Sequence, residues 1–175
     1  ADQIHGNVTV RKAVAGEKIV LLDGNEKELN ADDIVIADAS SALAIAGVMG
    51  GKNSAVSENT TNLFLEIAHF HAGLVRKTAK RHVINTDASF RFERGIDKAN
   101  VDLYGRALAD LIVQIAGGKI VAHEDVYPLP FIPQTISLNI AAFNAFSGIE
   151  IPQNEVASIL KHLGFGVAEH DDCIW

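Results

Sequence analysis

Three of the four prolines in this chain fall within six residues, at Pro128, Pro130 and Pro133. Proline fixes its own φ and removes a backbone donor, so this stretch favours a stiff, extended linker. We therefore expect a linker over residues 128–134, one domain over residues 1–127 and a second over residues 135–175. The second piece is near the lower limit of about 40 to 60 residues for an unassisted core, so we expect it to be the truncated start of a longer domain.

The composition is that of a globular chain, with 48% hydrophobic and 21% charged residues. No stretch approaches the roughly 20 apolar residues that a membrane-spanning helix requires. The sequence starts at Ala1 without an initiator Met or a secretory pattern, so we expect an excised piece of a cytoplasmic protein. Cys173 is the single cysteine, which excludes an internal disulfide framework and a multi-cysteine zinc site, and we expect it to be a bystander thiol.

The first half of the chain is typical of β structure. Asp23-Gly24 favours a tight hairpin turn, because glycine accepts positive φ. Apolar or alternating runs predict strands around Val8 and Val10 and over residues 34–37, 43–46 and 63–70, with a polar surface loop over residues 52–62. Along the last of these strands Glu66 and Ala68 share one face.

Helical spacing follows the predicted strands. One helix is expected from His71 to about Val83, and a longer one from an N-cap at Asp97 to Gly117-Gly118. The longer helix carries an apolar face that we expect to be core: Val101, Tyr104, Leu108, Leu111, Ile112 and Ile115. A strand over residues 119–127 would then return toward the linker.

Beyond the linker the pattern predicts a strand over residues 135–140, a helix from Pro152 to Gly164 and a strand over residues 166–175. The predicted fold class is therefore α+β. Its β-rich core has a mixed or antiparallel sheet that can close into a barrel, with two main packed helices, and a short α/β piece follows.

The net charge of −7 argues against a protein that grips nucleic acid over its whole surface. Residues 76–94 are an exception with a net charge of +4, which leaves −11 elsewhere. A solvated helix face explains such a run, and so does a local RNA contact. The candidate contact residues are Arg76, Lys77, Lys80 and Arg81.

Residues 85–95 stand out because small, polar and charged residues alternate with aromatics between two helices. Loops placed by a rigid scaffold commonly carry function. A structural role is the alternative, in which Asp87 or Ser89 caps a turn and Arg91, Glu93 and Arg94 form ion pairs.

Four motifs occur in a fixed order along the chain. They are Ala-Gly-Val-Met-Gly-Gly at 46–51, Thr-Asn-Leu-Phe-Leu-Glu at 61–66, Arg-Lys-Thr-Ala-Lys-Arg at 76–81 and Thr-Asp-Ala-Ser-Phe-Arg-Phe-Glu-Arg-Gly at 86–95. In this order they resemble the editing region of the bacterial phenylalanyl-tRNA synthetase beta subunit, and the resemblance covers nearly the whole chain.

The resemblance implies a module that hydrolyses tyrosine wrongly attached to tRNA(Phe). A pocket that hydrogen-bonds the extra hydroxyl can discriminate by a factor of about 10⁴, which a pocket made for phenylalanine cannot. By resemblance, Glu66 corresponds to the carboxylate that recognises the phenol, and Gly47, Gly50, Thr86 and Ala88 to the rest of the pocket. No catalytic nucleophile is legible.

Each of these residues also has a plain structural interpretation. Glu66 can pair with Arg76 or Arg81, Gly47 and Gly50 can form a β-bulge, and Thr86 and Ala88 can be ordinary turn residues. Family members carry a His-Ala-Phe-Asp segment before the position of Ala1 whose histidine belongs to the pocket, so we expect this chain to lack part of the pocket.

The resemblance also implies partners for the parent enzyme: tRNA(Phe), an alpha subunit in an alpha2-beta2 heterotetramer and the remaining beta-subunit domains. The parent ligase uses ATP and magnesium, and no cofactor is expected in this chain. Two other functions stay open. Glu66, His69 and His71 are close enough in sequence to suggest a metal-dependent hydrolase, and the basic run suggests a non-catalytic tRNA-binding or subunit-assembly module.

Overall fold

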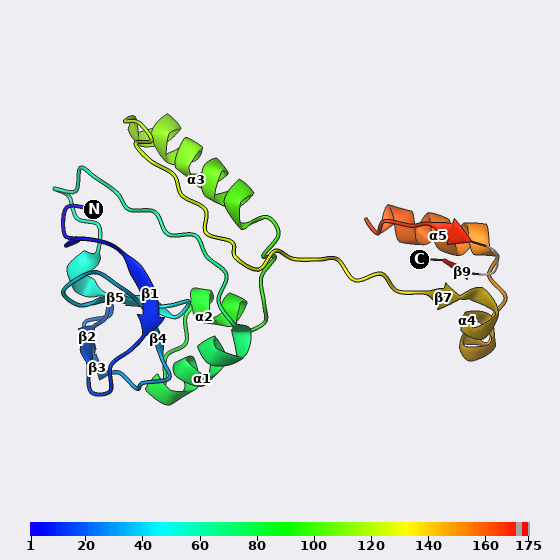
Figure 1. Ribbon diagram of the computed structural model, residues 1–175, viewed down its shortest axis with the longest axis horizontal. Coiled ribbons are helices and arrows are strands. Elements are labelled where there is room, and N and C mark those ends of the chain that lie inside the picture. Colours follow the sequence, from blue (N-terminus) through cyan, green and yellow to red (C-terminus); the bar gives the residue numbers. More distant parts are fainter. Residues whose placement is uncertain (171–172, 175) are drawn as a thin grey trace. The chain divides into compact units, whose positions relative to one another are not determined.

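The computed structural model describes residues 1–170 and 173–174, with side chains described through residue 168. The chain divides into two compact units, Ala1–Leu129 and Pro130–Trp175, and the division falls inside the proline-rich stretch. Figure 1 shows the helices and strands of each unit. The predicted bystander role of Cys173 lies outside the described side chains.

The centre of the first unit is an antiparallel sheet with strand order β1-β4-β5-β6. Its strands are β1 (Thr9–Lys12), β4 (Ile34–Ala37), β5 (Ala42–Ile45) and β6 (Met49–Gly50). The register pairs Val10 with Ile36 and Val35 with Ile45. The strands expected over residues 34–37 and 43–46 are confirmed to within one residue. In the part of the chain that is described, the sheet stays open and closes into no barrel.

A hairpin of β2 (Lys18–Val20) and β3 (Glu26–Glu28) turns at Asp23-Gly24, as predicted. Gly24 has a φ of +85°, a conformation that costs glycine little. An isolated bridge from Leu21 to Gly51 joins the hairpin to the sheet.

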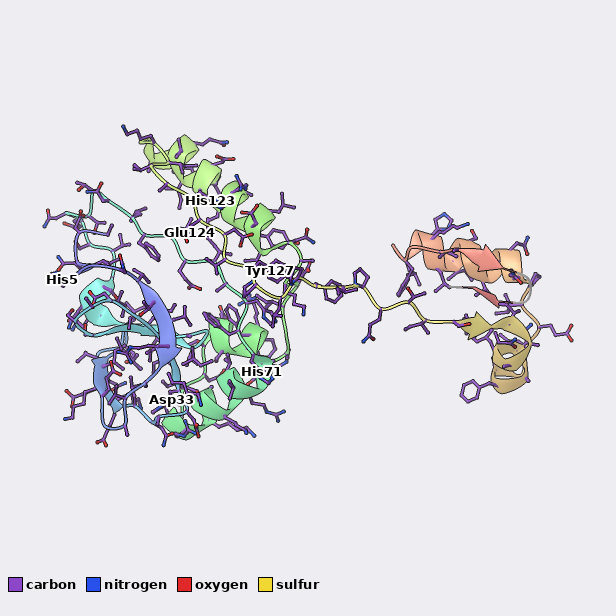
Figure 2. All side chains as sticks on the ribbon, viewed as in Figure 1. His5, Asp33, His71, His123, Glu124 and Tyr127 are labelled. Carbon is purple, nitrogen blue, oxygen red and sulfur yellow. The ribbon has the colours of Figure 1, made fainter. Side chains whose placement is uncertain are left out.

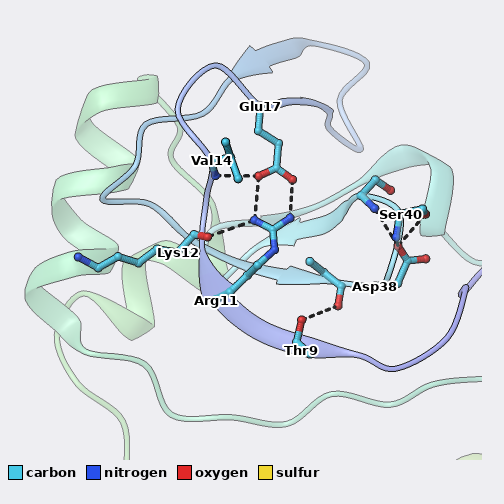
Figure 3. A network of polar contacts seen from close by, with 9 residues as sticks. Thr9, Arg11, Lys12, Val14, Glu17, Asp38 and Ser40 are labelled. Atoms are coloured by element: carbon cyan, nitrogen blue, oxygen red, sulfur yellow. Dashed lines mark hydrogen bonds and ion pairs between the residues drawn. The ribbon is translucent and has the colours of Figure 1, made fainter.

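An ion pair braces the start of this hairpin. The guanidinium of Arg11 donates to both carboxylate oxygens of Glu17, at 2.7 and 2.9 Å (Figure 3). This contact raises the pKa of Arg11 and lowers the pKa of Glu17. Glu17 therefore stays ionised, and it also accepts a bond from the backbone N–H of Val14 at 3.0 Å.

Helix α1 (Ala72–His82) packs against the sheet and confirms the helix predicted after His71. It buries Val75 and Ala79 in the same core as Leu21, Val35 and Ile45. The helix ends at Val83, which adopts the left-handed conformation with a φ of +54°.

A buried carboxylate ties α1 to the loop before β4. Asp33 is fully buried, accepts bonds from Thr78 at 2.9 Å and from the Asn30 backbone at 2.9 Å, and contacts His82 at 2.6 Å. Arg81 also forms an ion pair with it. Burial alone would raise the pKa of Asp33, but the hydrogen bonds from His82, Asn30 and Thr78 outweigh burial and lower it. Figure 2 labels this residue.

Helix α2 (Asp87–Phe92) occupies the segment that we expected to be a loop between helices. Thr86 is its N-cap: its hydroxyl accepts from the backbone N–H of Ser89 at 3.0 Å, and the Ser89 hydroxyl accepts in return from the Thr86 N–H at 2.9 Å. This reciprocal pair is a capping box, which satisfies backbone donors that a short helix would leave exposed. The expectation that Ser89 helps to cap the turn is confirmed.

Two predicted strands are wrong. Residues 63–70 and 119–127 have no strand assignment, although both run as extended chain in Figure 1. A strand needs a neighbour for its ladder of hydrogen bonds. In the described residues neither segment pairs with a strand, so the β-rich sequence alone does not produce one.

Helix α3 (Val101–Ala116) has its N-cap at Asn100, three residues after the predicted N-cap Asp97. Asp97 instead accepts from the backbone of Ala99 at 2.9 Å and from the side chain of Asn100 at 2.7 Å. The expectation that its apolar face is core is wrong, because α3 has no buried residue. Leu111 is 48% exposed and Ile115 is 78% exposed.

The second unit contains α4 (Ile140–Ser147), α5 (Gln153–His162) and a small antiparallel sheet of β7 (Leu138–Asn139), β9 (Cys173–Ile174) and β8 (Glu169–His170). Helix α5 confirms the helix predicted after Pro152. The buried core of the second unit consists of Ile140, Val156 and Ala157. Helix α4 was missed: the predicted strand over residues 135–140 includes only its first residue, and no element was predicted over 141–147.

The α+β fold class is confirmed, and all of the described strand pairs are antiparallel. None of the helices in the described residues is long and apolar enough to cross a membrane.

Candidate functional site

Glu66 and Gly50 line one cavity of about 710 Å³, which we call the Glu66 cavity. Its floor comes from the sheet, through Ile36, Ala44 and Gly50, and its wall from the loop and extended chain that follow β6. Leu22, Leu43, Leu63 and Phe64 add apolar surface. The lining is therefore mixed, with apolar side chains beside polar and charged ones, and the volume is within the range of small-molecule sites.

Glu66 has no ion pair or hydrogen bond with any residue in the range 1–168, so the expected alternative of a pair with Arg76 or Arg81 does not form. The surrounding protein removes part of the water near its carboxyl group, and this desolvation raises the pKa of Glu66. The residue as a whole stays exposed. A carboxyl group in this setting can accept a hydrogen bond from a ligand hydroxyl without first losing a protein partner.

The beginning of the chain holds the cavity wall in place. The carboxylate of Asp2 accepts from the backbone N–H groups of Thr61 and Asn62, at 3.1 and 3.2 Å, and from the Asn62 side chain at 2.8 Å. These bonds, with that from the Asn62 side chain the strongest, lower the pKa of Asp2 to about 2. The extended chain that carries Glu66 is thus fixed near residues 1–4 although it belongs to no sheet.

Gly50 belongs to β6 and pairs with Ala44. A Cβ at this position would come within 3.2 Å of the Leu22 side chain. The absence of a side chain here leaves space beside Leu22 on the cavity floor.

Gly47 and Thr86 lie together at the junction with α1 and α2, and neither is among the residues that line the Glu66 cavity. A Cβ at Gly47 would lie 3.1 Å from both Phe70 and Val75. The Thr86 hydroxyl donates to the backbone carbonyl of Val48 at 2.7 Å, which fastens α2 to the glycine-rich turn. Ala88 is exposed on α2 and also lies outside the cavity lining.

The structure thus brings two of the five predicted pocket residues to one cavity. The glycine-rich turn connects the cavity residues to the pocket residues at α2, because only Val48 stands between Gly47 and strand β6, which carries Gly50. The role of all five in substrate binding stays a prediction.

The four basic residues of α1 differ in their surroundings. Arg76, Lys77 and Lys80 are exposed and have no ion pair in the range 1–168. Arg81 pairs with Asp33 and so stabilises the fold. Just after α2, the guanidinium of Arg94 lies 3.6 Å from the centre of the Phe90 ring and pairs with neighbouring Glu93 at 2.6 Å. This ion pair lies within residues 85–95 and does not join that segment to the core.

The described residues contain no cluster of side chains that could coordinate a metal ion. Nowhere in them do three His, Cys, Asp or Glu side chains gather in a way that could hold a metal ion, and this includes Glu66, His69 and His71. His71 (Figure 2) is the N-cap residue of α1.

Sequence reasoning missed Asp33 as a structural centre and Gln3 and Asn53 as cavity residues. Asp33 precedes a buried strand, which is a weak signal for a buried carboxylate. Gln3 and Asn53 both line the Glu66 cavity. No local pattern marks them, because they meet only after the chain has folded.

Comparison with known proteins gives a consistent result. The model of a family described as the B3/4 domain matches residues 1–117. The chain is 40% identical over 162 residues to a phenylalanine–tRNA ligase beta subunit of Geobacter sulfurreducens, covering 92% of this chain and 20% of that protein. It is 41% identical over 172 residues to that of Porphyromonas gingivalis, covering 98% and 20%, and 41% identical over 170 residues to that of Yersinia pestis, covering 96% and 21%. The chain spans about a fifth of the length of these relatives.

Proposed function

Because the chain belongs to the B3/4 domain family, we propose that it is the part of a phenylalanine–tRNA ligase beta subunit that hydrolyses tyrosine misattached to tRNA(Phe). The parent would attach phenylalanine to tRNA(Phe) with ATP and magnesium, in the cytoplasm, as an alpha2-beta2 heterotetramer. This chain would contribute the editing site and not the synthetic one. The proposal rests on the regional likeness to the relatives and on the cavity.

The observation that carries the proposal is the unpaired Glu66 carboxyl group in a cavity that also has apolar surface from Leu22, Leu63 and Phe64. The apolar walls suit an aromatic ring, and the carboxylate can accept a short, strong bond from the phenol hydroxyl of tyrosine. Phenylalanine would leave the carboxylate unpaired in a partly dehydrated place, which costs free energy. The cavity would therefore select tyrosine over phenylalanine.

Hydrolysis of the ester needs a positioned water and stabilisation of the developing charge. Glu66 is assigned to recognition, and no residue is assigned to activate the water. Gly50 provides room for the ring, while Gly47, Thr86 and Ala88 are proposed to support the pocket from the α2 side.

Hydrolysis of tyrosyl-tRNA(Phe) by purified chain tests this function. Glu66→Gln should lower kcat/KM for tyrosyl-tRNA(Phe) about tenfold to a hundredfold, the value of a hydrogen bond to a charged group, and should change hydrolysis of phenylalanyl-tRNA(Phe) little. The matched control is Glu58→Gln, an exposed glutamate in the adjacent loop that does not line the cavity. Equal rates for both variants on both substrates would refute the role of Glu66.

The pH dependence of the preference for tyrosyl-tRNA(Phe) provides a second test of the role of Glu66. Since the pKa of Glu66 is raised, its carboxyl group gains a proton at a higher pH than an ordinary glutamate. The preference for tyrosine should therefore be full above this pKa and should decline as the pH falls through it. In Glu66→Gln the preference should be weak and independent of pH over the same range.

A non-catalytic tRNA-binding or assembly module is the second candidate. Three exposed cations on α1, Arg76, Lys77 and Lys80, favour it. Binding of tyrosyl-tRNA(Phe) without release of tyrosine would support this candidate. Release that survives His69→Ala and EDTA but falls with Glu66→Gln would favour editing over both alternatives.

A further inference from the structure

A second cavity, of about 310 Å³, adjoins the Glu66 cavity, and we call it the polar cavity. It lies among the β2–β3 hairpin, the turn after β4, the short 3-10 helix η1 (Lys52–Ser54) and residues 3–5. Hydrogen-bonding side chains make up a larger share of its lining than they do in the Glu66 cavity. Its volume is at the lower end of the range of about 300 to 1,000 Å³ for ligand sites.

The charged groups of the polar cavity are already engaged. Asp38 accepts from the backbone N–H of His5 at 2.8 Å, from the N–H and hydroxyl of Ser40 at 2.8 Å each, and from the N–H of Ser41 at 2.9 Å (Figure 3 shows the contacts with Ser40). Lys18 pairs with Glu26 at 2.8 Å. Asp38 therefore builds the rim, and the cavity offers no free ion to a strongly charged ligand.

Four other groups on the rim keep their hydrogen-bonding capacity. They are the amides of Gln3 and Asn53, the imidazole of His5 and the hydroxyl of Ser41, none of which bonds to another side chain or backbone group in the range 1–168. Amide and imidazole groups both donate and accept. Such a set suits a neutral ligand that carries hydroxyl groups and ring nitrogens.

The two cavities share part of their wall. Gln3, Asn53 and Ser54 line both, together with Leu43 and Gly51. The Ser54 hydroxyl donates to the carbonyl of Leu43 at 2.9 Å and so fixes η1 against β5. A single ligand with an aromatic end and a polar, neutral end can therefore lie across the shared wall.

We propose that the polar cavity binds the terminal nucleoside of an aminoacyl-tRNA whose tyrosine side chain occupies the Glu66 cavity. Gln3 and Asn53 contact the ribose at the junction, beside the ester, while His5 and Ser41 face the base. This proposal rests on the proposed editing function. It adds a binding site for the RNA end to the site for the amino acid.

The test compares two stable ligands by isothermal titration calorimetry with the whole chain. One is 3′-deoxy-3′-(tyrosylamino)adenosine, in which an amide replaces the ester, and the other is tyrosinamide, which lacks the nucleoside. The nucleoside should lower Kd at least tenfold in the unsubstituted chain. The gain is the ratio of the two Kd values measured in the same variant, so an effect of Asn53 on tyrosinamide binding alone does not enter it. Asn53→Ala should remove most of this gain, about tenfold, because it takes away one or two hydrogen bonds.

Asn59→Ala is the matched control, since Asn59 lines the Glu66 cavity and not the polar cavity. Asn59→Ala should still bind the nucleoside ligand at least tenfold more tightly than tyrosinamide. Gln3→Ala repeats the test at the second residue that is proposed to contact the ribose. Circular dichroism shows whether each variant is folded. The proposal is overturned if the nucleoside brings no gain in the unsubstituted chain, or if folded Asn53→Ala and Gln3→Ala both retain that gain.

Failure here is distinguishable from failure of the editing function. If Glu66→Gln removes the preference for tyrosyl-tRNA(Phe) while Asn53→Ala keeps the nucleoside gain, editing stands and the nucleoside lies elsewhere. If Glu66→Gln has no effect on hydrolysis of either substrate, the editing function itself fails.

Discussion

Helix α1, which is rich in Lys and Arg, and helix α3, which is more apolar, have opposite surroundings. Both carry apolar residues at helical spacing, and both were predicted to pack on the core. Helix α1 buries Val75, Thr78, Ala79 and His82, whereas α3 buries none of its residues. The comparison shows that periodicity predicts a helix and its apolar face, while burial depends on a partner surface that the helix itself does not specify.

The partners explain the difference. Helix α1 meets the sheet, the turn at Gly47 and the ring of Phe70, and the buried carboxylate of Asp33 holds its last turn. Around α3 the contacts are sparser. Gly105 approaches Ile67, and Asp102 bonds to Arg106 and His123 at 2.8 Å each, which ties the extended return segment to the helix (Figure 2).

The largest effect is expected at Asp33. Asp33→Ala removes the acceptor for Thr78, His82 and Arg81 and leaves their polar groups buried or half-buried without a partner. We expect a loss of about 3 to 5 kcal/mol in the free energy of unfolding. Urea denaturation followed by far-UV circular dichroism measures it.

Asp32→Ala is the control for Asp33. Asp32 is exposed, with a 3.8 Å ion pair to exposed Lys12, and its removal should cost less than about 1 kcal/mol. Equal costs at the two positions would show that the buried network does not hold α1.

The next effect sets the two apolar faces against each other. Val75→Ala on α1 empties space in the core and should cost about 2 kcal/mol. Ile115→Ala on α3, where the side chain is 78% exposed, should change the stability by less than about 0.5 kcal/mol. The same denaturation experiment compares them, and a large cost at Ile115 would mean that α3 is covered in solution.

A third substitution should strengthen α3. Gly105 lies inside the helix, and a Cβ there would meet Ile67 at 3.5 Å, an ordinary contact distance. Gly105→Ala should therefore stabilise the helix by about 0.5 to 1 kcal/mol, because alanine loses less backbone entropy than glycine. Gly47→Ala is the contrasting change: it should destabilise, since its φ is +68° and its Cβ would crowd Phe70 and Val75. A destabilised Gly105→Ala would indicate a tighter contact with Ile67.

The smallest effect is expected at Asp102. The bond from Arg106 and then the charges of Arg106 and His123 lower the pKa of Asp102. Its contribution is therefore present above the ordinary aspartate pKa and is lost as the pH falls through the lowered value. Asp102→Asn should speed amide hydrogen exchange in residues 119–127 at neutral pH, with little change at low pH. Unchanged exchange at neutral pH would show that the return segment is held by other contacts.

Local chemistry made part of the fold predictable. Asp23-Gly24 predicted the hairpin turn, the apolar run at 34–37 predicted β4, and Pro152 marked the start of α5, since each depends on backbone preferences of a few residues. The segments at 63–70 and 119–127 were predicted wrongly for the opposite reason. A strand exists only with a hydrogen-bonded neighbour, and the sequence of the segment does not contain that neighbour.

The candidate site divides in the same way. The motif likeness selected Glu66 and Gly50, which the fold brings to one cavity. It could not indicate Gln3 and Asn53, which are 50 residues apart in the sequence and line the same two cavities only in the folded chain.

The sequence by itself determined the hairpin turn at Asp23-Gly24, the strand at 34–37, the start of α5 and the family likeness, because these depend on residue types and their spacing. Tertiary structure alone decided that Asp33 is the buried centre beneath α1, that the Glu66 carboxyl group is unpaired at a cavity wall and that the apolar face of α3 is uncovered. Burial and electrostatics depend on which distant segments come together, and that is set when the whole chain packs.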